Sequence, residues 1–460
     1  MKSYIYRKSI EYLRVWKVSE LRKPLIIRGA RQVGKSTLVN KFSQEYKNVI
    51  ILNLERPKDA RVFTELDEIS SIVDNLLLTY SLTKDELSET LLFIDEIQEV
   101  EQAIGQLRYF YEDFPDLHVI AAGSLLEHVI NKVQHFPVGR VQYLYLHPLN
   151  FQEFLKAKGK EAVLERLKKV PISNVVHTVI MDLFHEYALV GGMPEVVFSY
   201  VNYKDITSLT NIYESIWASY RDDVLKYAKS VTEQRVMHHI LTTAPSYIDQ
   251  RITFNRFGQS EYGSREVGDS FRSLDAAKVI QLIYPTTRTE VPIITDYRKS
   301  PRIQFLDTGI LNHNLNIQAQ LIEVKDLSTS FKGALLPHII TQELLSLDEL
   351  SRNKPHFWVR QKRTSQAEVD LVFQYQQYLI PIEVKSGAVG KLRSLHQYME
   401  ATNHPYAIRI YGGEFSIHPA TTPTGKQFYL MNLPYYLGSY INEYLNYFTE
   451  TYTVGRLPES

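Results

Sequence analysis

The chain has 460 residues, of which 44% are hydrophobic and 23% are charged, so a wholly disordered polypeptide is excluded and about three domains are expected. Its 52 Lys and Arg residues balance 52 Asp and Glu residues, which argues against a histone-like polycation but leaves room for a local basic groove. It has no cysteine, which excludes a disulfide scaffold, a cysteine zinc site, an iron–sulfur cluster and a thiol nucleophile.

The first third of the chain is predicted to alternate strands with helices. Apolar spacing predicts a helix within residues 1–23, and the apolar run at 25–27 predicts a buried strand that leads through a glycine-rich turn into a helix from about Lys35. The same patterns predict strands at 49–54, 91–94 and 117–122 and helices at 70–80 and 102–114. This alternation predicts an α/β fold with a parallel sheet and helices on both faces.

The pattern changes after residue 155. Residues 156–250 are predicted to be mostly helical, and a helix near 265–277 followed by strands at 279–284 and 303–306 is typical of a winged-helix-like arrangement. A helix at 331–350 and strands at 367–373 and 379–384 are predicted beyond it. The three expected domains span residues 1–155, 156–330 and 331–460.

A membrane protein is not expected. No segment approaches the roughly 20 apolar residues that cross a bilayer. The N-terminus is charged throughout and lacks the apolar stretch of a signal peptide. The sequence therefore predicts a soluble, cytoplasmic protein.

Residues 29–36, GARQVGKS, match the phosphate-loop pattern G-x-x-x-x-G-K-[ST] without a gap. Glycines let backbone N–H groups turn toward phosphate oxygens, and the helix behind them directs its positive end at the same phosphates. Lys35 is predicted to bridge the β- and γ-phosphates of ATP, and the Ser36 hydroxyl to ligate Mg²⁺. The alternative is a glycine-containing turn with an exposed lysine.

The predicted nucleotide-binding residues are Gly29, Ala30, Arg31, Gln32, Val33, Gly34, Lys35, Ser36 and Thr37. For Arg31, a phosphate contact and a structural role both remain open.

A second motif supports the first. The apolar run LLFI at 91–94 ends in Asp95 and Glu96. Asp95 is placed to serve nucleotide-bound Mg²⁺, usually through water, and Glu96 is placed to orient and polarise the attacking water. The alternative is a solvated turn after a core strand.

Two further residues are candidates for catalysis. Ser124 follows the strand predicted at 117–122 and is placed to contact the γ-phosphate or the attacking water, unless it is an ordinary turn serine. Arg140 is the best candidate for an arginine finger, which would stabilise charge on the transferring phosphoryl group within the chain or in a neighbouring subunit. The alternative for Arg140 is a surface charge.

These segments resemble a known group of proteins. RGARQVGKSTL, LLFIDEIQ, AAGSLL and LHPLNFQEFL are similar to segments of prokaryotic AAA-type ATPases that carry a C-terminal restriction-endonuclease-like domain of unassigned function. The resemblance continues through YALVGGMPEVV, RIQFLDTGIL, EVDLVF and IPIEVKSG, and so covers residues from about 10 to about 390. It implies an ATPase core, a helical and winged-helix-like middle, and a nuclease-like C-terminal domain with an α/β fold.

The C-terminal domain carries the D…E-x-K pattern of restriction-type nucleases. Asp370 and Glu383 are expected on adjacent strands, where two carboxylates hold Mg²⁺, and Lys385 is expected to activate water or steady the phosphate. The period of two places Glu383 and Lys385 on one strand face. Taken alone, the pattern also fits an ordinary hairpin with surface charges.

One departure from the family puts DNA cleavage in doubt. The family's preceding helix begins with a motif close to G-x-x-F-E, whereas this chain has GALLP at 333–337, with Pro337 where glutamate is expected. Glu343 is six positions on, which corresponds to about 600° of helix rotation and hence to a different face. Either Glu343 substitutes from another angle, or the metal site is incomplete.

Three functions fit these motifs. The first is an ATP-driven AAA-type protein that couples ATP turnover to DNA binding or remodelling through a nuclease-like domain. The second is an ATP-regulated DNA nuclease, and the third is a nucleotide-switch ATPase that acts on a protein partner and has a vestigial C-terminal domain. ATP and Mg²⁺ are the expected cofactors, and DNA and a second copy of the chain are candidate partners.

Overall fold

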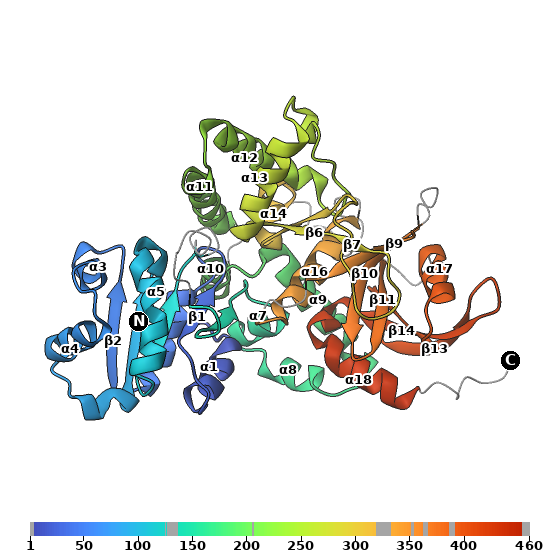
Figure 1. The fold of residues 1–460 in the computed structure, drawn as a ribbon. Helices are drawn as coiled ribbons and strands as arrows, with labels where there is room; N and C mark the ends of the chain where they lie inside the picture. Colours follow the sequence, from blue (N-terminus) through green and yellow to red (C-terminus); the bar gives the residue numbers. More distant parts are fainter. Residues whose placement is uncertain are drawn as a thin grey trace. The chain divides into compact units, whose positions relative to one another are not determined.

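A computed structural model describes residues 4–124, 126, 137–204, 207–318, 333–350, 354–361, 367–385 and 392–452 of the protein. The chain divides into two compact units (Figure 1). The first contains Met1–His147, Ala276–Val279 and Asp348–Arg352, and the second contains Pro148–Asp275, Ile280–Leu347 and Asn353–Ser460. The three-domain division stays a prediction. No helix in the described part of the chain is long and apolar enough to cross a bilayer.

The first unit contains a five-stranded parallel sheet, as predicted. The strands lie in the order β2–β3–β4–β1–β5. Their bounds are β1 Leu25–Arg28, β2 Asn48–Asn53, β3 Thr90–Asp95, β4 His118–Ala122 and β5 Gln142–Tyr145. The α/β fold class is therefore confirmed, although β5 was not predicted.

Helices cover this sheet. They are α1 Ser9–Lys17, α2 Lys35–Phe42, α3 Pro57–Thr64, α4 Ile69–Tyr80 and α5 Glu101–Asp113. Helices α3, α4 and α5 surround β2 in Figure 1, and their apolar side chains form one core with alternate residues of the strands, such as Ile50, Leu52, Leu92 and Ile94. Helix α1 is shorter than the helix predicted within residues 1–23, and α3 was not predicted.

The second unit begins with helices, as predicted after residue 155. They are α7 Phe151–Ala157, α8 Glu161–Leu167, α9 His177–Val190, α10 Pro194–Tyr203, α11 Thr210–Tyr227, α12 Val231–Thr243, α13 Ser264–Ala276 and α14 Thr308–Asn314. Strands β6 Ile280–Ile283 and β8 Arg302–Phe305 follow α13 and pair antiparallel. The helix and the two strands expected of a winged-helix-like segment are thus present.

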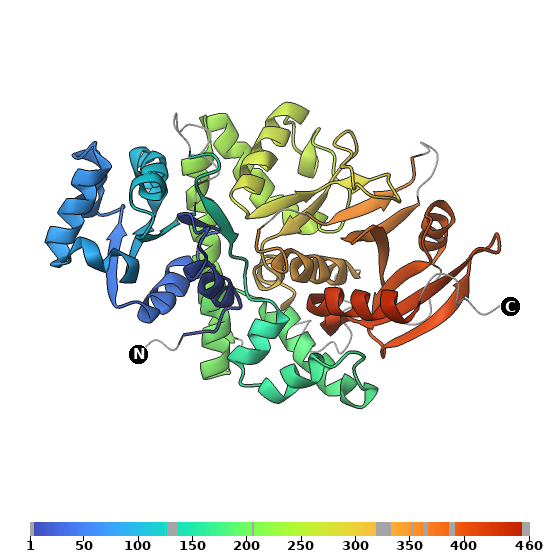
Figure 2. The same ribbon diagram turned by 60° about the horizontal axis from the view of Figure 1, so that its bottom comes forward.

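The C-terminal part of the second unit is a mixed seven-stranded sheet, drawn in orange and red in Figure 2 except for its short strand near residue 285. Its order is β13–β14–β12–β11–β10–β9–β7. The bounds are β7 Pro285–Thr286, β9 His356–Val359, β10 Glu368–Tyr375, β11 Tyr378–Lys385, β12 Tyr406–Tyr411, β13 Ser416–Thr421 and β14 Gln427–Pro434, with helices α16 Leu335–Ser346, α17 Arg393–Ala401 and α18 Ile441–Thr451. Strands β10 and β11 form the predicted antiparallel hairpin, with Tyr375 opposite Tyr378.

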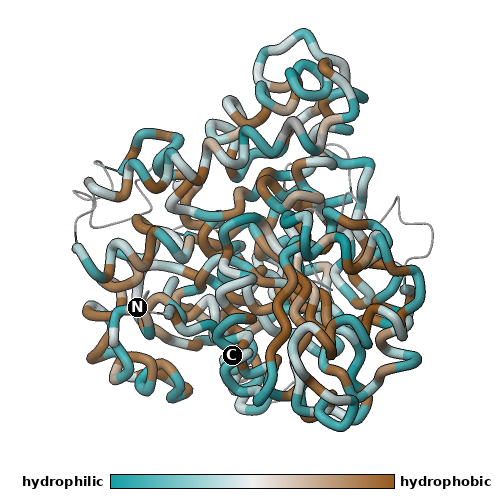
Figure 3. The backbone as a smooth tube through the Cα atoms, turned by 90° about the vertical axis from the view of Figure 1, so that its left-hand side faces the viewer, coloured by the Kyte–Doolittle hydropathy of each residue, from teal (hydrophilic) through white to brown (hydrophobic). Residues whose placement is uncertain are grey.

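Hydrophobic residues supply the interior of both units. Figure 3 shows brown, hydrophobic stretches running through the interior and teal, hydrophilic stretches mostly at the outer turns. In the C-terminal sheet, Leu395, Tyr398 and Met399 of α17 pack on strand residues that include Trp358 and Leu379. Burial of such side chains contributes about 1.5–3 kcal/mol each.

Two segments that carry the family resemblance, YALVGGMPEVV and RIQFLDTGIL, contact each other in the structure. Gly191 and Gly192 of the first lie against Asp307 of the second, and this contact is called the glycine joint below. The Gly192 N–H donates to the Asp307 carboxylate at 2.6 Å, and the same side chain caps α14 through the Ile310 N–H at 3.1 Å. A Cβ on Gly191, whose φ is 74°, would lie 2.4 Å from Asp307 Oδ1. These segments therefore hold the helical part together, and their glycines are required by close packing.

Replacing Gly192 with alanine is expected to destabilise this joint. The added Cβ would lie 2.1 Å from the Leu149 carbonyl oxygen, a backbone atom that cannot move aside easily. Such overpacking costs about 3 kcal/mol, so Gly192→Ala should lower the denaturation midpoint. Gly263→Ala is the matched control, because its Cβ would meet nothing closer than 3.7 Å. Equal midpoints for the two variants would contradict the close-packed joint.

Candidate functional site

The phosphate-loop sequence forms the predicted strand, loop and helix. Strand β1 ends at Arg28, and α2 begins at Lys35. Gly29 has a φ of 143°, and a Cβ there would lie 2.3 Å from the Leu146 carbonyl oxygen. Gly34 has a φ of 93° and directly precedes the helix. Both glycines therefore occupy backbone conformations that other residues rarely adopt.

The side chain of Lys35 folds back into the phosphate loop that precedes this residue. Its ammonium donates hydrogen bonds to the carbonyl oxygens of Gly29, at 3.0 Å, and Ala30, at 2.9 Å. The side chain is buried, and burial lowers its pKa to about 8, although Glu96 and Asp95 act in the opposite direction. The two carbonyls thus hold the ammonium where phosphates are expected, at the N-terminus of α2.

Asp95 and Ser36 lie together at one edge of the sheet. Asp95 is the last residue of β3, and burial raises the pKa of its carboxyl group, while the Ser36 hydroxyl acts to lower it. Neighbouring ligands of an octahedral Mg²⁺ ion lie about 3 Å apart, because each lies about 2.1 Å from the metal. Ser36 and Asp95, which interact here, supply two oxygens of the kind that the predicted magnesium site requires.

Glu96 is held by a residue to which the sequence assigned no role. Gln98 Nε2 donates to Glu96 Oε2 at 2.7 Å and to Glu99 Oε1 at 3.3 Å. A Cβ on Gly123, at the end of β4, would lie 2.3 Å from Gln98 Oε1, so Gly123 makes room for this amide. Ser124 is the next residue. It follows the carboxyl end of β4, the strand that lies between β1 and β3 in the sheet. The sequence signal that could have identified Gln98 is the final glutamine of the segment LLFIDEIQ.

The two candidate arginines lie apart from each other. Arg31 is 3.9 Å from Glu55, and its charge contributes to lowering the pKa of Lys35. Arg140 Nε lies 3.1 Å from Glu112 Oε1, and its side chain is 46% exposed. Because Gln142 pairs with Leu25 in parallel register, Arg140 lies near the amino edge of the sheet, whereas the phosphate loop follows the carboxyl end of β1. The structure does not bring Arg140 to the loop of its own chain.

This placement gives a prediction for Arg140 acting on a neighbouring subunit. Arg140→Ala should retain nucleotide binding and lose hydrolysis by about 10³-fold, because a finger stabilises charge that develops in the transition state. Mixing it with Lys35→Ala should restore part of the activity. Arg108→Ala is the control, since Arg108 shares the Glu112 partner at 2.9 Å. A fully active protein that stays monomeric with ATP would contradict the prediction.

A second set of charged residues gathers at β10 and β11. Lys385 Nζ lies 2.8 Å from Glu383 Oε1, so these two side chains share one strand face. Asp370 Oδ2 accepts a hydrogen bond from the Val384 N–H at 2.9 Å. Burial raises the pKa of Glu383, and the Asp370 charge raises it further. Lys385 is thus paired with Glu383, and Asp370 contacts the backbone of the same strand, while the D…E-x-K site itself stays a prediction.

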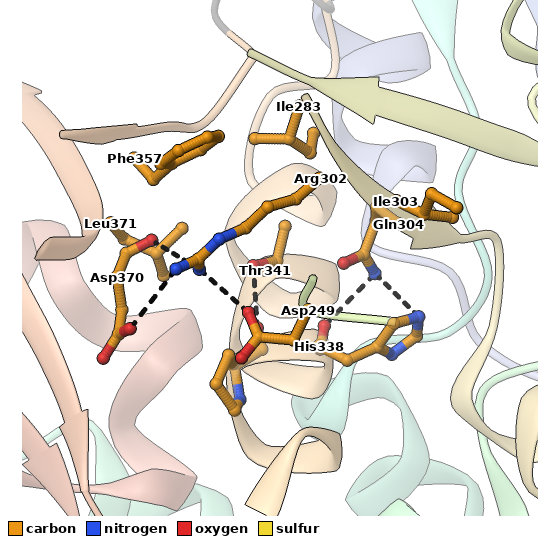
Figure 4. A pocket seen from close by; sticks show the side chains of 11 residues that line it. Asp249, Ile283, Arg302, Ile303, Gln304, His338, Thr341, Phe357, Asp370 and Leu371 are labelled. Atoms are coloured by element: carbon orange, nitrogen blue, oxygen red, sulfur yellow. Dashed lines mark hydrogen bonds and ion pairs between the residues drawn. The ribbon is translucent and has the colours of Figure 1, made fainter. Parts of the chain in front are cut away.

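Two acids and an arginine that the sequence did not indicate complete this set. Arg302 of β8 donates to Asp249 at 2.8 Å, and its Nη2 lies 3.7 Å from Asp370 Oδ1 (Figure 4). Arg302 also donates to Glu368. Burial raises the pKa of Asp249 to about 7 against the lowering effect of Arg302. No spacing rule connects residues 249 and 302 to residue 370, so only the fold identifies them.

Glu343 does not join this set. Its carboxylate accepts hydrogen bonds from the Phe151 N–H at 3.1 Å and the Tyr187 hydroxyl at 2.7 Å, and burial raises its pKa to about 7. Pro337 instead lines a small, open recess whose lining also includes Asp370, Asp249 and Arg302. The substitution by Glu343 considered above is therefore not observed. Within the described ranges, no group of three or more His, Cys, Asp or Glu side chains could hold a metal ion.

Comparisons with known families cover most of the chain. Residues 21–155 match the AAA domain family. Residues 181–321 and 332–436 match two domains of unknown function, DUF8612 and DUF4143. Residues 21–155 therefore have the fold of AAA-type P-loop ATPases, as predicted. These matches assign no function to the C-terminal domain and leave its restriction-endonuclease-like character a prediction.

Individual proteins are similar only at low identity. An uncharacterized protein of Haemophilus influenzae is 26% identical over 207 residues, which are 42% of this chain and 44% of that protein. The Walker-type ATPase paby2304 of Pyrococcus abyssi shares 15% identity, with a TM-score of 0.44 over 68% of this chain and 96% of its own. The Aeropyrum pernix ORC1 protein, solved in complex with DNA, shares 10% identity, with a TM-score of 0.28 over 70% of this chain and 95% of its own.

Proposed function

We propose that the protein is a Mg²⁺-dependent ATPase that hydrolyses ATP at the phosphate loop and couples turnover to DNA binding or remodelling through its C-terminal domain. The observation that carries the ATPase proposal is the junction of α2 and β3. Lys35 and Ser36 begin the helix, Lys35 donates to the loop carbonyls of Gly29 and Ala30, and Ser36 interacts with Asp95. A match to the AAA domain family over residues 21–155 supports the same assignment.

Each residue has a distinct part in this proposal. Lys35 exchanges its two carbonyl partners for the β- and γ-phosphates, which present stronger, charged acceptors. Ser36 and Asp95 hold Mg²⁺, directly or through water, and the metal neutralises charge on the phosphates. Glu96 orients and polarises the attacking water, while Gln98 holds the carboxylate in place by donating to Oε2. Ser124 contacts the γ-phosphate or that water, and Arg140 completes the site of a neighbouring subunit.

The DNA step is supported by the charged set at β10 and β11. Asp370, Glu383 and Lys385 interact there, as expected of a nuclease-like domain. The same geometry favours a second candidate function, an ATP-regulated DNA nuclease. Pro337 in the recess and the engaged carboxylate of Glu343 weigh against cleavage, because no acid from α16 is available to the site.

One experiment separates these functions. The protein is incubated with labelled DNA, ATP and Mg²⁺ or Mn²⁺, and both phosphate release and DNA length are measured. ATP hydrolysis that DNA stimulates, without cleavage, supports the coupling proposal. Cleavage that Asp370→Asn abolishes selects the nuclease. Hydrolysis that ignores DNA overturns the coupling step, and no hydrolysis under any condition overturns the ATPase assignment.

A further inference from the structure

The guanidinium of Arg302 lies where the C-terminal carboxylates converge. Its Nη1 donates to Asp249 Oδ1 at 2.8 Å and approaches the Asp370 carbonyl oxygen at 3.5 Å. Its Nη2 pairs with Glu368 and lies 3.7 Å from Asp370 Oδ1. The side chain is only 12% exposed and lies over the Phe357 ring, 4.7 Å from its centroid. Figure 4 shows the guanidinium directed between Asp370 and Asp249.

These contacts leave little for a metal ion to bind. Asp370 Oδ2 is occupied by the Val384 N–H, and Asp370 Oδ1 faces Arg302. Glu383 Oε1 is occupied by Lys385, whereas Glu383 Oε2 is buried and has no hydrogen-bond partner among the residues that the structure describes. Mg²⁺ and Mn²⁺ need oxygen ligands at about 2.1 Å, so a shared ion requires at least one oxygen of Asp370 to be released. A cation already beside that oxygen also repels the metal.

Arg302 is the main cation that neutralises the neighbouring carboxylates. Asp249, Glu368 and Asp370 all interact with Arg302, and each of their side chains is less than one quarter exposed. Buried carboxylates require a paired cation or a metal. Arg251 is the other arginine near Glu368, but it is 40% exposed and lies 3.9 Å away. Arg302 therefore supplies most of the positive charge that a divalent metal would otherwise provide.

We propose that Arg302 keeps the carboxylate site closed to divalent metal, and that a metal binds at Asp370 and Glu383 only when this guanidinium withdraws. The free oxygen Glu383 Oε2 is then the first ligand available to the incoming ion, and Asp370 Oδ1 the second. This inference goes beyond the proposed function, because it concerns metal binding at the C-terminal domain and does not depend on ATP hydrolysis.

The test is a calorimetric titration of the full chain with Mn²⁺ alone. Binding that is absent in Asp370→Asn is assigned to this site, which separates it from any metal held at Ser36 and Asp95. The wild type should bind weakly here, and Arg302→Gln should bind about 10- to 100-fold more tightly, the range over which groups next to a metal site change affinity. Arg251→Gln is the matched control and should bind like the wild type.

A second variant guards against misfolding, since Arg302→Gln leaves three carboxylates without their main partner. Arg302→Gln combined with Glu368→Gln removes an ion pair as a unit and keeps Asp370 and Glu383 intact. It should show the same tightening. The proposal is overturned if a folded variant, either Arg302→Gln or the double variant, binds Mn²⁺ no more tightly than the wild type. It is also overturned if Arg251→Gln tightens Mn²⁺ binding equally.

Discussion

Lys35→Ala should lose ATP affinity by at least about 100-fold. The substitution deletes the ammonium proposed to bridge the β- and γ-phosphates. Hydrogen bonds to charged groups contribute about 1.5–3 kcal/mol each, so two of them correspond to about 3 kcal/mol or more, and each 1.4 kcal/mol is a factor of ten in affinity. Calorimetry with ATP and Mg²⁺ measures the loss directly.

The matched control for this variant is Lys41→Ala. Lys41 lies on the same helix, α2, but its ammonium is exposed and donates to Gln44 at 2.9 Å. Its removal should leave ATP affinity unchanged within about twofold, because it lies outside the predicted phosphate contacts. Lys35→Ala should still fold, since alanine is a good helix former and no buried charge is left behind. A folded Lys35→Ala protein with wild-type affinity would contradict the phosphate-loop assignment.

Glu96→Gln should bind ATP normally and hydrolyse it about 10²- to 10⁴-fold more slowly, which is the usual contribution of a general base. The amide has the same shape as the carboxylate and can still contact Gln98, so positioning survives while basicity is lost. Nucleotide affinity and steady-state phosphate release, measured on one preparation, separate the two effects.

Glu99→Gln provides the control for this second variant. Glu99 accepts a hydrogen bond from the same Gln98 amide at 3.3 Å, but its side chain is exposed. Turnover should therefore stay within about twofold of the wild type, because a general base must reach the proton that it abstracts. If the Glu96→Gln variant hydrolyses ATP at the wild-type rate, the general base must be another residue.

The sequence predicted the phosphate loop because its determinants are local. An apolar run, two glycines and a lysine within a dozen residues fix a strand, a turn and a helix start, and the structure has them there. Strand β5 was missed because Gln142–Tyr145 is short and mostly half-buried, so it lacks the apolar run that marks a central strand. Helix α3 was missed for a similar reason, since Phe63 is its only buried residue.

The second site shows what local patterns cannot supply. The E-x-K spacing predicted that Glu383 and Lys385 share a face, and their ion pair confirms this geometry. Arg302 and Asp249 reach Asp370 from segments far away in the chain, so their proximity depends on tertiary packing alone. Glu343 was considered because of its nearness in sequence to Pro337, but a helix turns these two positions in different directions.

The burial of Lys35 links nucleotide binding to protons. Its pKa of about 8 lies below the 10.5 of an ordinary lysine, so between these values the folded chain binds fewer protons than the unfolded chain. This group therefore adds stability to the folded protein as the pH rises from 8 toward 10.5. Phosphates favour the charged ammonium and raise its pKa again. If ATP binds here as proposed, its binding above about pH 8 is expected to be accompanied by proton uptake, so alkaline conditions should weaken the nucleotide complex while they stabilise the folded loop.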